Sequence, residues 1–204
     1  MDQLIFFINK VLVSGSVLGS VYALGAIGVT LIFGILRFAH FAHGDMMTMG
    51  AFIAFVLAGL LAGAGIHVGF LPTGFVVLPI AMVITAIIAL GIDKAFYAPL
   101  RKRGARPFTL LIASIGVTLM IQGLIRLFFG VSTRSFFETE PKKILRFDMG
   151  WIGAGRDITF TLPELLMVIV TVVLVLVLHL FLSRTRLGKA MRAMSDNADL
   201  AQVS

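Results

Sequence analysis

The chain has 204 residues, of which 59% are hydrophobic and 13% are charged, and its formal net charge is +7 at pH 7. A soluble domain carries about 25% charged residues, so this composition excludes an ordinary soluble protein and indicates a membrane protein. The absence of Cys excludes disulfides, thiol catalysis and thiolate metal sites. The basic residues lie in short segments beside apolar runs, so membrane topology and lipid headgroups explain the charge better than nucleic acid does.

Five apolar runs are long enough and poor enough in charge to be membrane-spanning helices. They extend over about 11–36, 46–64, 75–92, 108–129 and 162–182. The sequence therefore predicts an all-α integral membrane protein with five transmembrane helices in one domain over 1–204. The first run is far longer than the core of a signal peptide, so we predict that it is retained as a span.

Two histidines and an aspartate follow the first span, at His40, His43 and Asp45. On a helix, His40 and His43 would share a face and could bind a metal, but no further ligands cluster nearby, so we predict no metal site. Alternatively, the segment is a break at Gly44 between two helical pieces, with backbone that lines a cavity, or it is an ordinary cytoplasmic turn. Ionisable residues near the membrane are functional candidates, which places these three in a candidate translocation path.

The distribution of basic residues predicts the orientation. They are concentrated in the connection 93–107 and in the segment from Arg184 onward. Two spans separate these segments, so both lie on one side of the membrane, and the positive-inside rule assigns that side to the cytoplasm. The loop 131–161 and the N-terminus are then periplasmic, in a protein of the inner membrane.

The fourth span carries polar residues every fourth position, at Ser114, Thr118, Gln122 and Arg126. This spacing places them on one helical face. Lipid would be a costly environment for Gln and Arg, so the face should meet protein or water. The face either forms hydrogen bonds between helices or lines a solute path, and we include Ser114, Thr118 and Gln122 in the candidate translocation path.

The fifth span begins with Thr161-Leu-Pro-Glu164. This is the pattern of a capping box with Pro in the first helical turn. Glu164 is therefore predicted to be a structural cap rather than a transport residue, although it lies beside an apolar run.

An amphipathic helix is predicted over about 186–201, directly after the fifth span. Its apolar residues repeat with helical spacing, at Leu187, Ala190, Met191, Met194, Ala198 and Ala201. The helix could lie on lipid headgroups or fit a groove in a cytoplasmic partner. The sequence has no HExxH, G-x-S-x-G or Walker A motif, so we predict neither catalysis nor a cofactor, and active transport would need a partner that hydrolyses ATP.

Three blocks occur in a distinctive order: Gly19 to Arg37 continuing through Phe41-Ala-His-Gly-Asp45, then Tyr97-Ala-Pro-Leu-Arg101 with Thr109 to Leu119, then Arg186-Leu-Gly-Lys-Ala-Met-Arg-Ala193. Over essentially its whole length, the chain resembles the permease subunits of high-affinity branched-chain amino acid ATP-binding-cassette importers, of the LivH type. The resemblance implies an inner-membrane subunit that works with a second permease subunit, two cytoplasmic ATPase subunits and a periplasmic substrate-binding protein.

The resemblance also implies that the amphipathic helix is a coupling helix that docks onto an ATPase. The residues expected to make this contact are Leu187, Gly188, Met191, Arg192, Ala193, Met194 and Ala198. ATP-driven closure of the ATPase pair would push this helix and shift the spans between outward and inward access.

Two departures from the family pattern bear on function. The family usually has Asn at the position of His40, which bears on the identity of the solute. The chain stops at Ser204, inside the coupling segment, where family members continue with more spans, so we expect a fragment.

Other functions compete with import of leucine, isoleucine or valine. An importer of urea, short amides or other small amino acids belongs to the same class. A secondary transporter or channel without ATPases would need ionisable residues at mid-span, and this chain has almost none. A membrane enzyme using His40, His43 and Asp45 would need an accompanying nucleophile or ligand set, and the sequence offers no such set.

Overall fold

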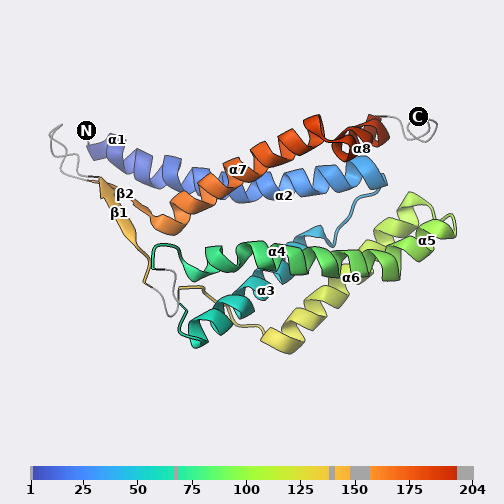
Figure 1. Ribbon diagram of the computed structural model, residues 1–204, viewed down its shortest axis with the longest axis horizontal. Helices are drawn as coiled ribbons and strands as arrows, with labels where there is room; N and C mark the ends of the chain where they lie inside the picture. The colour runs from blue at the N-terminus through green and yellow to red at the C-terminus, as the bar shows by residue number, and fades with distance from the viewer. Residues whose placement is uncertain (1, 67–68, 138–140, 148–156, 197–204) are drawn as a thin grey trace. The chain divides into compact units, whose positions relative to one another are not determined.

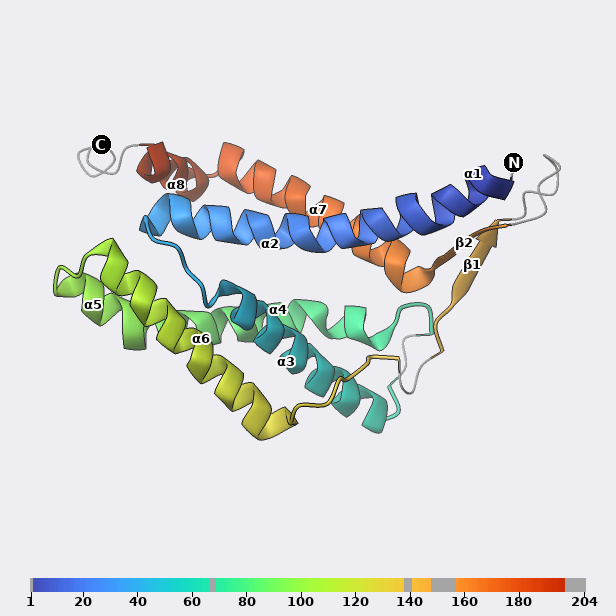
Figure 2. The ribbon, with the colours of Figure 1, turned by 180° about the vertical axis from the view of Figure 1, so that it is seen from behind.

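The computed structural model describes residues 2–66, 69–137, 141–147 and 157–196, and most of them are helical (Figures 1 and 2). The elements are α1 Asp2–Phe7, α2 Ser14–Leu36, α3 His43–Gly63, α4 Thr73–Ile92, α5 Ala98–Lys102, α6 Pro107–Phe129, β1 Ile144–Phe147, β2 Ile158–Thr161, α7 Leu162–Arg184 and α8 Arg186–Asp196. A π-helical turn at Ile8–Val13 joins α1 to α2, and another at Asp93–Tyr97 joins α4 to α5.

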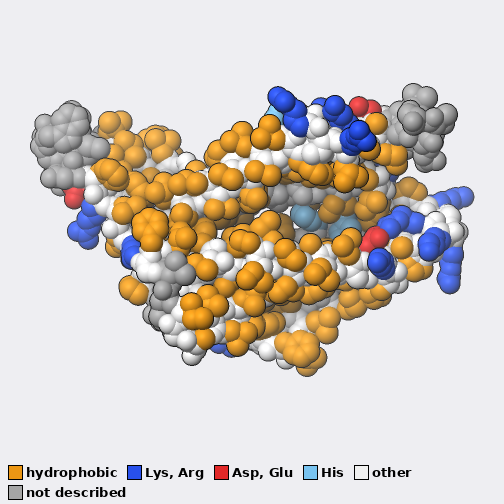
Figure 3. Space-filling model, in the orientation of Figure 1, with side chains coloured by type: hydrophobic (Ala, Val, Ile, Leu, Met, Phe, Trp, Pro, Cys, Tyr) orange, Lys and Arg blue, Asp and Glu red, His pale blue; other side chains and the backbone are white. Residues whose placement is uncertain are grey.

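Within the described residues, five helical stretches are long and apolar enough to cross a membrane, as the sequence predicts. They are Gln3–Leu36, His43–Gly63, Thr73–Lys102, Pro107–Phe129 and Leu162–Arg184. Apolar side chains cover much of the helical surface (Figure 3), and many large ones are more than half exposed. Surface of this kind needs lipid or a protein partner to cover it, so the structure confirms an all-α membrane protein.

Two of these helical stretches extend beyond the apolar runs. The first begins near Asp2 rather than near Val11, and Leu4 to Phe7 continue its apolar character. The third continues from Ile92 through Asp93 to Lys102, in the segment where the sequence predicts a connection. Leu, Arg and Lys are good helix formers, so charge at the end of a span does not by itself end the helix.

The chain divides into two compact units, which we describe separately: Leu36–Glu140, and Met1–Ile35 with Pro141–Ser204. In the unit Leu36–Glu140, α3 packs against both α4 and α6. The buried core of this unit consists of Phe38, Ala42, Ile92, Tyr97, Leu110, Val117 and Ile121. The non-helical connection 37–42 and the second π-turn therefore both contribute to one core.

In the other unit, α8 packs against α7, and β1 pairs antiparallel with β2, with Ile144 opposite Thr161. These strands lie within 131–161, where the sequence predicts only a loop. Asn9 in the first π-turn binds β2 and the residue before it, because its Nδ2 donates to Asp157 O at 2.9 Å and its Oδ1 accepts from the Thr159 N–H at 3.1 Å. The capping box is present, and the Thr161 N–H donates to Glu164 Oε2 at 2.7 Å.

Candidate functional site

The polar stripe on α6 faces the connection 37–42 and the first turn of α3. Ser114 is fully buried, and its Oγ accepts a hydrogen bond from the Phe41 N–H at 3.2 Å. Two turns further on, Gln122 Nε2 donates to Asp45 Oδ1 at 3.0 Å. The structure therefore brings Gln122 to Asp45, and Ser114 to the connection before α3. The contact between Gln122 and Asp45 is an interhelical hydrogen bond, which was one of the two interpretations of the stripe.

Thr118 lies between Ser114 and Gln122 on the same face. Its Oγ1 is buried and has no hydrogen-bond partner within the described part of the chain. Buried hydroxyls are usually hydrogen-bonded, and an exception calls for a water, a ligand or another part of the assembly as its partner. Thr118 therefore keeps a buried hydroxyl available on this face of α6.

The connection 37–42 is not helical, so it separates the two histidines. Helix α2 ends at Leu36, Arg37 adopts a positive φ of 56°, and His43 begins α3. His40 therefore precedes the helix that His43 opens, and the shared helical face on which the metal interpretation rested does not exist. Among the described residues, no group of three His, Asp or Glu side chains could hold a metal ion.

His40 instead packs against aromatic rings of the unit's core. Its ring centroid lies 5.0 Å from that of Tyr97 and 5.7 Å from that of Phe38. Burial lowers the pKa of His40 below its usual 6.5, an effect that His43 reinforces and Asp93 opposes. The imidazole is therefore mainly neutral at pH 7 and can offer a hydrogen bond rather than a charge.

The His40 and Tyr97 side chains each carry a buried polar atom that has no hydrogen-bond partner in the described residues. They are Nδ1 of His40 and the hydroxyl of Tyr97, whose side chain is only 2% exposed. Each can form one more hydrogen bond to water or to a polar solute group. The sequence indicates His40 as a candidate site residue. Tyr97 was not among the candidates, because an aromatic residue within the basic connection 93–107 resembles an interfacial anchor.

An ion pair fixes the second π-turn. Arg101 Nη1 donates to Asp93 Oδ1 and Nη2 donates to Asp93 Oδ2, each at 2.8 Å. This bidentate geometry is the strongest form of the Arg–carboxylate contact. The eight-residue spacing is not one of the usual helical pairings, and the π-turn between the partners adds a residue to the turn, so spacing rules do not reveal the pair.

Helix α8 is held tightly to the C-terminal end of α7. The Gly188 N–H donates to Thr185 Oγ1 at 2.9 Å, and Arg192 Nη2 donates to Leu182 O at 2.6 Å. A Cβ at Gly188 would lie 2.5 Å from Leu182 Cα and closer still to Phe181 O. Gly188 is therefore required by the close approach of the two helices.

The residues predicted to contact an ATPase fall into groups. Gly188 and Arg192 bind α7, Met191 and Met194 are half-buried, and Leu187 and Ala193 are exposed, Leu187 to 70%. Ala198 lies outside the described residues. One face of α8 therefore packs against α7, and another face is exposed. Helical spacing alone does not distinguish the residues that bind α7 from the exposed residues.

Residues 11–204 match the family described as branched-chain amino acid transport system, permease component. The chain is 29% identical over 203 residues to the high-affinity branched-chain amino acid transport system permease protein BraD of Pseudomonas aeruginosa, covering 100% of this chain and 64% of the relative. It is 29% identical over 210 residues to the corresponding permease protein LivH of Escherichia coli K12, covering 99% of this chain and 63% of the relative.

A third relative is the probable branched-chain amino acid transport permease protein LivH of Methanocaldococcus jannaschii, which is 28% identical over 199 residues, 96% of this chain and 58% of the relative. No solved structure matches the chain significantly. The chain spans less than two thirds of the length of these curated relatives. The match nevertheless covers all five long apolar helices from Val11 onward, so the chain belongs to the family of branched-chain amino acid transport system permease components.

Proposed function

We propose that this chain forms the membrane-spanning part of a permease subunit that carries branched-chain amino acids across the inner membrane as part of an ATP-binding-cassette importer. The family match over 11–204 carries this proposal. The names of the relatives BraD and LivH support the solute class. The sequence has no nucleotide-binding motif, so ATP would have to be hydrolysed by a partner. The resemblance to these importers implies two cytoplasmic ATPase subunits, a second permease subunit and a periplasmic binding protein.

Six residues make up the proposed translocation path, and their contacts support different roles. They are His40, His43, Asp45, Ser114, Thr118 and Gln122. Ser114 and Gln122 already bond to the Phe41 N–H and to Asp45, which supports a positioning role for them. His40 and Thr118 each keep a buried polar atom without a partner in the described residues, which supports contact with the solute.

His40 can offer a solute a hydrogen bond rather than a charge. Its neutral imidazole keeps a buried Nδ1 without a partner in the described residues, and the adjacent Phe38 and Tyr97 rings are themselves buried. A charged imidazole would repel the ammonium group of an amino acid, and the lowered pKa of His40 keeps that charge away at pH 7. This combination supports the amino acid class without distinguishing leucine from valine, because one methylene changes affinity by only about 1–3 kcal/mol.

Coupling to ATP hydrolysis would use the exposed face of α8. Leu187 and Ala193 are exposed and are the residues we propose to meet an ATPase. Gly188 and Arg192 hold α8 to α7, so a push on α8 would move α7 with it rather than bend the junction. Such rigid transfer is what a switch between outward and inward access requires.

An uptake experiment tests this function. Cells that lack their own importer would express the full-length gene with its neighbouring permease, ATPases and binding protein, and would receive labelled leucine, isoleucine or valine. We expect uptake that an ATPase-dead variant abolishes and that excess urea does not reduce. ATP-dependent uptake of a different solute would contradict the solute class and direct attention to His40. Uptake that is indifferent to the ATPases would contradict the importer assignment.

A further inference from the structure

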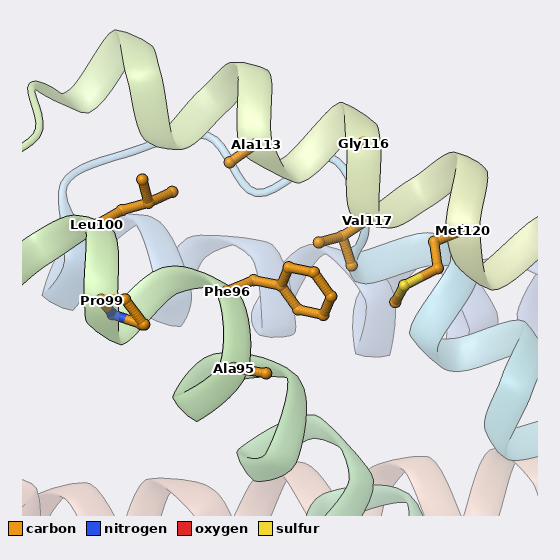
Figure 4. A pocket seen from close by; sticks show the side chains of 8 residues that line it. All are labelled: Ala95, Phe96, Pro99, Leu100, Ala113, Gly116, Val117 and Met120. Atoms are coloured by element: carbon orange, nitrogen blue, oxygen red, sulfur yellow. The ribbon is translucent and has the colours of Figure 1, made fainter.

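An open apolar groove of about 480 Å³ lies within the unit Leu36–Glu140 (Figure 4). One wall is the helical stretch before Lys102, and the other is α6. The side chains that define these walls are Phe96, Leu100, Ala113, Val117 and Met120. Gly116 lies between the α6 residues, and no other atom lies within 4 Å of the position that a Cβ would occupy there. The chain thus leaves this groove unfilled.

The second π-turn shapes this groove. Tyr97 points into the core of the unit and is 2% exposed, whereas the neighbouring Phe96 is 41% exposed and lines the groove. The ion pair between Arg101 and Asp93 bridges the turn and holds this arrangement in place. The groove is therefore a built feature of the helical hairpin, and it is separate from the polar stripe.

The turn 103–106 connects the two helices that form the walls of the groove. Gly104 has a φ of 72°, which allows the chain to reverse there. Lys102, Arg103 and Arg106 are exposed, and none of their three side chains has an ion-pair or hydrogen-bond partner in the described residues. Figure 3 shows Lys and Arg side chains gathered at the end of this unit where α5 lies. The helices that form the apolar groove are thus connected at a group of unneutralised cations.

We propose that this groove binds an acyl chain of an anionic glycerophospholipid whose headgroup phosphate contacts Lys102, Arg103 and Arg106. Basic groups beside apolar clefts between membrane helices recognise anionic headgroups. Arg can bind phosphate oxygens in bidentate fashion, and Lys adds a point charge. The charge selects this occupant over a neutral lipid. Binding of this lipid requires neither the proposed solute nor an ATPase partner.

Tryptophan fluorescence provides the test. Phe96→Trp places a probe in the groove, and Trp151→Phe removes the single native Trp of the 204 residues. Leu119→Trp is the matched control, because Leu119 is 65% exposed on α6 and does not line the groove. Each variant of the full chain, purified with its co-purifying subunits, would be reconstituted in phosphatidylcholine vesicles. The vesicles would contain increasing fractions of brominated phosphatidylglycerol or brominated phosphatidylcholine, which quench Trp on contact.

For the Trp at position 96, we compare the lipid fractions that give half of the maximal quenching. We expect this fraction to be at least about fivefold lower for brominated phosphatidylglycerol than for brominated phosphatidylcholine. The control Trp at position 119 should show no such preference. Neutralising the turn with Lys102→Gln, Arg103→Gln and Arg106→Gln should remove the preference at position 96. Gly116→Leu should reduce quenching there by both lipids, because its side chain enters open space in the groove.

Two results would overturn the proposal. If both brominated lipids quench position 96 equally, the groove holds only bulk lipid. If neither lipid quenches position 96 while position 119 is quenched, a protein segment covers the groove. Should Phe96→Trp fail to fold, phosphatidylglycerol with a photoreactive acyl chain can be applied to the unmodified chain. Adducts on 95–100 and 113–120 should then exceed those from the phosphatidylcholine analogue, and equal labelling would contradict the proposal.

Discussion

At the scale of single residues, the burial of His40 makes the stability of the fold depend on pH. Its ring lies among Phe38 and Tyr97. Burial lowers its pKa below 6.5, so the unfolded chain binds a proton more readily than the folded chain does. The free energy of unfolding must therefore fall as the pH drops through about 6.5 and recover as the pH rises.

His40→Asn should remove this part of the pH dependence while keeping a polar side chain of similar reach. We expect thermal unfolding in detergent, compared between about pH 8 and about pH 5, to show a smaller loss of stability for His40→Asn than for the parent chain. His179→Asn, in the other unit, is the matched control for the replacement of a histidine by Asn. An equal loss in the parent and in His40→Asn would show that burial of the neutral ring is not the cause.

Glu164 tests whether an acidic residue beside a span acts in folding or in transport. Its carboxylate accepts the Thr161 N–H at 2.7 Å at the start of α7. Glu164→Ala should lower the free energy of unfolding by about 0.5–2 kcal/mol, and Glu164→Gln should lower it less, because an amide oxygen can still accept the bond. Denaturation in mixed micelles measures this difference. Solute uptake per folded molecule should remain at the parent level in both variants, and a selective loss of uptake in Glu164→Gln would assign the carboxylate to transport.

At the scale of elements, the junction of α7 and α8 depends on the absence of one side chain. Gly188→Ala places a Cβ within 2.5 Å of Leu182 Cα, so α8 must move away from α7. Overpacking of this kind costs about 1–3 kcal/mol. We expect hydrogen exchange of the α8 amides to become markedly faster and ATP hydrolysis to lose its coupling to transport.

Two controls separate this effect from others. Gly59→Ala, on α3, adds the same methyl group where no other atom lies within 4 Å, and it should leave exchange and transport unchanged. Ala193→Glu changes the exposed face of α8 without touching α7, so it should impair coupling while leaving the exchange of the α8 amides slow. Normal coupled transport in Ala193→Glu would count against ATPase docking through this face.

The helices differ in how far the sequence predicts them. Long apolar runs predict the spans, and the Thr161-Leu-Pro-Glu164 signal predicts the start of α7. The continuation through Asp93–Tyr97 to Lys102 is not predictable in this way, because basic residues resemble a connection and the π-turn changes the spacing. The four-residue strands β1 and β2 are too short to show a period.

The candidate site is also only partly predictable from the sequence. The four-residue spacing predicts that Ser114 and Gln122 face one way, and both contact the segment just before and at the start of α3. Their partners, the Phe41 N–H and Asp45, follow from tertiary packing, which spacing within one helix does not specify. Tyr97 was missed for a related reason, because its burial against His40 depends on the path of the connection 37–42.

At the scale of the whole molecule, function depends on which ends of the helices face the cytoplasm. The turn 103–106 and α8 are both rich in cations, and the positive-inside rule predicts that both are cytoplasmic. The segment after α6 would then be periplasmic. The absence of Cys makes this orientation directly testable, since a single introduced thiol has no background within the 204 residues.

Arg103→Cys and Thr133→Cys place thiols at exposed positions beyond the two ends of α6. We expect a membrane-impermeant maleimide to label Thr133→Cys in cells with a permeabilised outer membrane, and to label Arg103→Cys only after the inner membrane is opened. Ser183→Cys, at the end of α7, should behave like Arg103→Cys, because one further span returns the chain to the cytoplasm. The reverse pattern would place α8 in the periplasm, where no ATPase could reach Leu187. Coupling through α8 and the predicted orientation would then both be wrong, whereas the lipid groove, which requires only its cations and apolar walls, would be unaffected.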